Sequence, residues 1–148
     1  MPKPDAALLD RSRYLFSHET TTRFADLDNN NHINNVATAI FFEDMRVRFD
    51  TSIGMQGIFR GNGLRPMIVS LNIEFMAEAF YPRPVTGYMG TTAIGRSSWE
   101  VASILTQGDT VYAYMRAIMV CGGKEGGSAP LPDDVRQALE SVRLTEPA

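Results

Sequence analysis

The chain has one cysteine, two histidines and no long apolar run among its 148 residues. Because Cys121 has no second cysteine to pair with, an intramolecular disulfide is excluded. The histidines, His18 and His32, do not have the spacing of a metal site, so we expect no bound metal. We also expect no cofactor. No apolar segment reaches the roughly 18 residues that cross a bilayer, and we expect a cytoplasmic protein without a membrane partner.

The chain also lacks an excess of positive charge, since its formal net charge is −3. A nucleic-acid partner, which requires a basic face, is therefore not expected. Hydrophobic residues make up 44% of the sequence and charged residues 21%, as in an ordinary globular domain. We expect residues 1–148 to form a single domain with a core over about 18–121.

Alternation, helical spacing and turn residues indicate the secondary structure. Threonines favour a strand over residues 18–24, and the Asn- and Asp-rich segment 26–32 predicts a tight irregular loop. Apolar residues at helical spacing predict one long helix from Asn35 to Ile53. Its first half is apolar nearly all round, so we expect other structure to enclose it. Further strands are predicted over 67–75, 85–95, 99–107 and 110–120, and a short surface helix over 132–142.

One long helix followed by closely linked strands predicts an α+β fold, with a curved antiparallel sheet of about five strands wrapped around the helix. Residues 23–28 read Arg-Phe-Ala-Asp-Leu-Asp, residues 32–35 read His-Ile-Asn-Asn, and residues 42–46 read Phe-Glu-Asp-Met-Arg. Together with Gly-Arg-Ser-Ser-Trp at 95–99 and Leu-Pro-Asp-Asp at 131–134, these segments resemble the signature of the hotdog-fold acyl-CoA thioesterases, the 4-hydroxybenzoyl-CoA thioesterase-like family. The resemblance implies hydrolysis of an acyl-CoA to a free acid and coenzyme A.

By this resemblance, three residues carry the reaction. Asp28 matches the carboxylate that acts as general base or as nucleophile, two routes that the sequence leaves open, although an Asx turn alone also explains an aspartate here. The backbone N–H of Asn35, at the start of the helix, would donate to the oxyanion. His32 either orients the water or shapes the loop through a structural hydrogen bond. Glu43 and Arg46, three residues apart on the helix, are expected to form a structural pair.

The substrate partner is expected to be an acyl-CoA, whose phosphates are well matched by arginine. Arg96 is the candidate by resemblance, with Ser97, Ser98 and Asn34 as further substrate-binding residues. The glycine-containing segment 54–66 is expected to be a loop that borders the acyl pocket. Thr38 stands where the family often has a tyrosine, which puts the identity of the substrate in doubt.

The assembly and two rival functions also follow from the resemblance. A single sheet leaves edge strands, so we expect a homodimer or homotetramer with the site at a subunit boundary. One rival is a non-catalytic acyl-CoA-binding hotdog module, which has no need of Asp28. The other is a hotdog acyl hydratase or dehydratase using His32 and Glu43, although asparagines replace the Gly- and Pro-rich segment of those enzymes. An acyl carrier protein in place of coenzyme A stays open.

Overall fold

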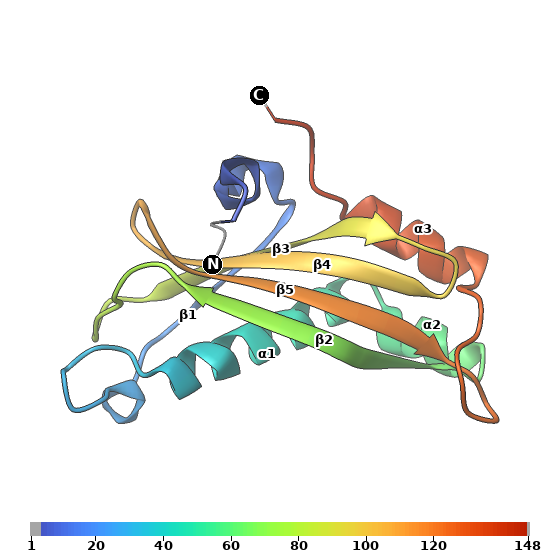
Figure 1. Ribbon diagram of the computed structural model, residues 1–148, viewed down its shortest axis with the longest axis horizontal. Coiled ribbons are helices and arrows are strands. Elements are labelled where there is room, and N and C mark those ends of the chain that lie inside the picture. Colours follow the sequence, from blue (N-terminus) through green and yellow to red (C-terminus); the bar gives the residue numbers. More distant parts are fainter. Residues whose placement is uncertain (1–3, 148) are drawn as a thin grey trace.

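The structure, a computed structural model, describes residues 4–147. Five strands form one antiparallel sheet in the order β1-β3-β4-β5-β2, and one long helix, α1, lies along one of its faces (Figure 1). The α+β prediction is confirmed, and the arrangement is the hotdog fold. The elements are η1 (Ala6–Leu9), η2 (Arg11–Arg13), β1 (Phe16–Thr20), η3 (Phe24–Asp26), α1 (Asn35–Ser52), α2 (Met55–Gly61), β2 (Arg65–Phe75), β3 (Val85–Ile94), β4 (Ser98–Gln107), β5 (Thr110–Gly122) and α3 (Asp133–Ser141).

The predicted long helix is confirmed, and α1 packs closely against the sheet. The caps explain its limits, since the Asn34 side chain accepts a hydrogen bond from the N–H of Val36 and Gly54 follows with a φ of 70°. A Cβ at Gly87 on β3 would overlap the Met45 side chain, so glycine lets the helix approach this strand. The side of α1 that faces the sheet is buried through Ala37, Thr38, Phe41, Phe42, Met45 and Phe49.

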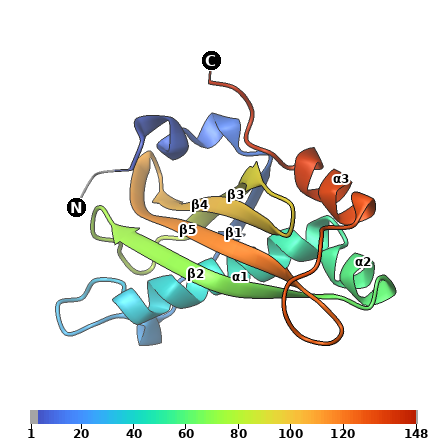
Figure 2. The ribbon, with the colours of Figure 1, turned by 45° about the vertical axis from the view of Figure 1, so that its right-hand side comes forward.

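The opposite side of α1 is exposed in the single chain. Val36 is 66% exposed and Ile40 is 55% exposed. The prediction that the first half of the helix is enclosed is therefore wrong for one chain, because a single sheet covers one side only. β2 is an edge strand of the sheet (Figure 2), and it also carries exposed apolar side chains. Its exposed apolar side chains are Ile68, Val69, Leu71 and Phe75.

Two other predictions need correction. The first strand spans Phe16–Thr20 and not 18–24, because the Thr22 hydroxyl donates to the carbonyl of Arg83 at 2.9 Å and the chain then turns into η3. The segment 54–66 is not a loop throughout, since α2 forms over Met55–Gly61 and buries Phe59. Among residues 4–147, no helix has both the length and the apolar character needed to cross a bilayer.

Candidate active site

A tight turn between η3 and α1 fixes the position of Asp28. The Asp28 N–H donates to the carbonyl of His32 at 2.9 Å, and Oδ1 of Asp28 accepts from the backbone N–H groups of Asn30 at 2.8 Å and His32 at 3.1 Å. Asn31 takes a φ of 61°, which asparagine tolerates better than most residues. The hydrogen bonds from His32 and Asn30 lower the pKa of the Asp28 carboxyl, so it is ionised at neutral pH.

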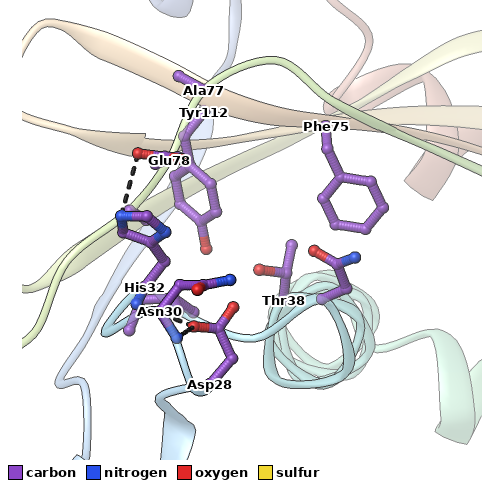
Figure 3. Close-up of a pocket in the computed structure, with 11 residues that line it drawn as sticks. Asp28, Asn30, His32, Thr38, Phe75, Ala77, Glu78 and Tyr112 are labelled. Carbon is purple, nitrogen blue, oxygen red and sulfur yellow. Dashed lines mark hydrogen bonds and ion pairs between the residues drawn. The ribbon is translucent and has the colours of Figure 1, made fainter.

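The two oxygens of the Asp28 carboxylate therefore have different surroundings. Oδ1 holds the turn, whereas Oδ2 accepts no hydrogen bond from any other residue in the described range 4–147. Figure 3 shows the carboxylate at the rim of a pocket, close to the first turn of α1. An Asx turn and an available anionic oxygen thus coexist in one side chain.

The N-terminus of α1 is anchored through the backbone of Asp26, whose carboxylate is buried. Asp26 is 2% exposed and accepts hydrogen bonds from the backbone and the guanidinium of Arg23, both at 2.8 Å. Its own carbonyl accepts from the N–H of Asn34, which caps the helix. Asn35 follows and lines the pocket, and its N–H belongs to the first helical turn, where backbone donors have no intrahelical acceptor. A positive helix end therefore faces the pocket that Asp28 borders.

His32 is oriented by a residue that the sequence did not single out. Its Nε2 lies 3.1 Å from Oε2 of Glu78, an ion-pair distance when the ring is protonated. The ring also packs edge-on against Phe80, with 5.4 Å between ring centroids. The next residue, Ile33, donates its N–H to the carbonyl of Ala79 at 2.8 Å, so the loop is tied to the β2–β3 connection. Glu78 lies in this irregular connection, which has no periodic sequence pattern that would predict a place for Glu78 in the site.

The pocket is a cavity of about 280 Å³ between the turn, the start of α1 and the sheet (Figure 3). Its most buried polar residues are Thr38, 1% exposed, and Tyr112, 2% exposed. Tyr112 reaches it from β5, far along the chain, and no local motif predicts its presence. The lining residues are Asp28, Asn30, His32, Ile33, Asn35, Thr38, Phe75, Ala77, Glu78, Ala79 and Tyr112.

The predicted coenzyme A residues do not meet Asp28 within one chain. Arg96 and Ser97 line a separate small hollow with Ser128, and Ser98 begins β4. They lie at the β3–β4 turn, at the opposite end of the sheet from the N-terminus of α1 (Figure 1). Asn34 caps the helix and is not among the lining residues of the pocket. Segment 54–66 does not line this pocket within one chain either, so its place beside the acyl group stays a prediction.

The remaining sequence candidates have structural surroundings. Cys121 is fully buried, and burial raises the pKa of its thiol, which disfavours a reactive thiolate. Glu43 and Arg46 form the expected pair on α1, with 3.2 Å between Oε1 and the guanidinium. Among residues 4–147, no group of three His, Cys, Asp or Glu side chains is arranged to hold a metal ion.

Comparison with known proteins gives one family. The family model described as the thioesterase-like superfamily matches residues 22–139. The uncharacterized protein YsmA of Bacillus subtilis is 23% identical over 135 residues, which cover 90% of either chain. The structure of a predicted thioesterase from Bacillus stearothermophilus is 25% identical, with a TM-score of 0.76 over 89% of this chain and 98% of that one. The hypothetical protein SAV2348 from Staphylococcus aureus, solved in complex with CoA, is 19% identical, with a TM-score of 0.80 over 92% and 90%.

Proposed function

The chain belongs to the thioesterase-like superfamily, and we propose that it hydrolyses an acyl-CoA thioester to a free acid and coenzyme A. The observation that carries this proposal is the free Oδ2 of Asp28 at the rim of a pocket that the first turn of α1 also lines. The similar fold of a protein that was solved in complex with CoA supports coenzyme A as the thiol part of the substrate.

Asp28 supplies the anionic oxygen for the reaction. As a general base it takes a proton from water while the water oxygen bonds to the thioester carbon. As a nucleophile it forms an acyl anhydride that water then hydrolyses. Either route gives a tetrahedral intermediate whose C–S bond breaks, and the thiolate leaves and is protonated. Both routes require the ionised carboxylate, and hydrogen bonds that lower the pKa of Asp28 favour that form.

The N–H of Asn35 is the donor to the oxyanion. It lies at the start of an 18-residue helix, whose dipole favours negative charge at this end. Preorganised backbone donors of this type stabilise the intermediate without reorganisation. His32, held by Glu78, borders the same pocket and orients the attacking water.

A second copy of the chain completes the coenzyme A site in this proposal. Pairing of two β2 edges would cover their exposed apolar side chains and would run the two sheets in opposite directions. That symmetry places the β3–β4 turn of one copy towards the Asp28 end of the other. Arg96, with Ser97 and Ser98, then binds coenzyme A phosphates across the boundary. The exposed Val36 side of α1 offers a further contact for a homotetramer.

A screen of acyl-CoA esters with free-thiol detection tests the proposal. We expect thiol release by the wild-type protein, and a loss of about 10²–10⁴ in Asp28→Asn, the range for a positioned acid or base. Asparagine keeps an oxygen acceptor for the turn, so the variant stays folded. Asp44→Asn, on the exposed surface of α1 beside Arg48, is the matched control and should retain full activity.

Two outcomes contradict the proposal. Wild-type turnover in folded Asp28→Asn removes Asp28 from the reaction. Loss of the ultraviolet absorbance of an enoyl-CoA without thiol release identifies a hydratase instead.

A further inference from the structure

The phenol of Tyr112 is a buried polar group without a use in the reaction described above. Its hydroxyl has no partner with hydrogen-bond geometry within residues 4–147, although the side chain is only 2% exposed. Burial raises the pKa of this phenol, and the nearby Thr38 hydroxyl lowers it in part. Buried polar atoms are nearly always paired, and an unpaired one destabilises the fold. The same side chain lines the cavity that Asp28 and Asn35 border, and Figure 3 shows its hydroxyl directed into it.

We propose that the Tyr112 hydroxyl donates a hydrogen bond to a second oxygen on the acyl group, so that the substrate is a short acyl-CoA with a hydroxyl or keto oxygen close to the thioester. This inference rests on the proposed function and adds a substrate class to it. Tyr112 is then a specificity-determining residue, because it contacts the part of the acyl group that does not react.

The position of the phenol along α1 supports this assignment. Thr38 lies three residues beyond Asn35, a rise of about 4.5 Å along the helix. Thr38 is 1% exposed and stands beside the phenol (Figure 3), so this part of the pocket is its deep end. A thioester carbonyl at the Asn35 N–H therefore directs the next acyl carbons towards Thr38 and Tyr112. A cavity of about 280 Å³ leaves room for a short chain.

The chemistry of the group fits a donor. Burial raises the pKa of Tyr112 to about 12, so the phenol keeps its proton at neutral pH. A plain alkyl chain in this pocket would leave the hydroxyl buried and unpaired in the complex as well. A site that is built to bond a substrate oxygen discriminates against an analogue without it for that reason.

Two esters of equal chain length test the inference, 3-hydroxybutyryl-CoA and butyryl-CoA. We expect the wild-type protein to favour the hydroxylated ester in kcat/KM by about tenfold to a hundredfold, the effect of one buried hydrogen bond. Tyr112→Phe should bring this ratio close to one, by lowering the value for the hydroxylated ester alone. Tyr114→Phe removes a hydroxyl from the same strand outside the pocket and should leave the ratio unchanged.

A binding measurement separates failure of this inference from failure of the proposed function. In an Asp28→Asn background, calorimetry should give tighter binding of the hydroxylated ester, and adding Tyr112→Phe should remove the difference. If the hydroxylated ester binds more tightly but the wild type releases no thiol, the proposed hydrolase activity is contradicted and the role of Tyr112 is upheld. Equal kcat/KM values for the two esters in the wild type overturn this role of Tyr112. An equal loss of kcat/KM for both esters in Tyr112→Phe also overturns it, because the phenol would then contact the thioester carbonyl that both esters share. Measuring the unfolding midpoint of Tyr112→Phe checks that this variant is folded. Removal of an unpaired hydroxyl should not lower the midpoint.

Discussion

The ionisation of Asp50 gives a prediction about stability that the structure makes quantitative. This carboxylate lies on α1 with 13% of its side chain exposed, and the guanidinium of Arg46 is 4.0 Å away. Burial raises the pKa of Asp50 to about 6, and the positive charge of Arg46 offsets only part of this effect. The ionised form is therefore less favourable in the folded protein than in water.

The sign and size of the effect follow from linkage. The pKa of Asp50 is 3.8 in the unfolded chain and about 6 in the folded one. The folded state therefore binds more protons than the unfolded state at pH values between these two. Protonation of Asp50 thus contributes to the free energy of unfolding. This contribution is fully present below the pKa of the unfolded chain and is lost as the pH rises through about 6. At about 1.36 kcal/mol per unit, the loss is about 3 kcal/mol at neutral pH.

Urea unfolding of the wild type and of Asp50→Asn, from about pH 4 to pH 7.5, measures this contribution. We expect Asp50→Asn to be more stable than the wild type at the upper end, with a gap that closes as the pH falls. Protein concentration is held constant, since subunit association changes apparent stability. Asp44→Asn on the exposed side of α1 should change stability by no more than about 0.5 kcal/mol. A gap between wild type and Asp50→Asn that does not vary with pH would refute the reasoning.

Four further measurements follow from the structure. Asp28→Ala removes the acceptor of two backbone N–H groups and should lower the free energy of unfolding by about 1–2 kcal/mol relative to Asp28→Asn, which urea titration measures. Arg96→Ala should raise KM for acyl-CoA at unchanged kcat in steady-state assays, and a fall in kcat alone would contradict phosphate binding. Leu71→Lys on the exposed β2 edge should shift the mass in light scattering towards the monomer and reduce turnover, whereas an unchanged mass would exclude β2 as the interface. Gly87→Ala should destabilise the fold by about 1 kcal/mol in thermal unfolding, the low end for overpacking, because its Cβ overlaps the flexible end of the buried Met45 side chain.

The sequence was most informative where signals are local. The cap at Asn34 and the glycine at 54 bracket the long helix, and alternation marks the strands that follow, so these elements were predicted nearly to the residue. The grouping of Asp28, His32 and Asn35 was also predictable, because a short turn must keep such neighbours together. Their catalytic roles stay predictions.

Features that depend on distant contacts were not predictable. Glu78 and Tyr112 reach the pocket from an irregular connection and from β5, and neither belongs to a pattern that points to the turn. α2 was missed because Gly57 and Gly61 weaken the helical signal, while burial of Phe59 stabilises it in the fold. Arg96 lies in a hollow apart from Asp28 within one chain, and the proposed meeting of the two residues depends on chain association, which one sequence does not reveal.

The main-chain bonds that hold the Asp28 carboxylate have an evolutionary consequence. Its orientation depends on the amide groups of residues 30 and 32, and no side chain of the cavity wall is needed to support it. Wall residues such as Phe75 and Thr38 can therefore be exchanged one at a time while the Asp28 carboxylate keeps its orientation. If the proposed hydrolase is correct, descendants of such a protein can acquire new substrates by small steps that leave the carboxylate in place.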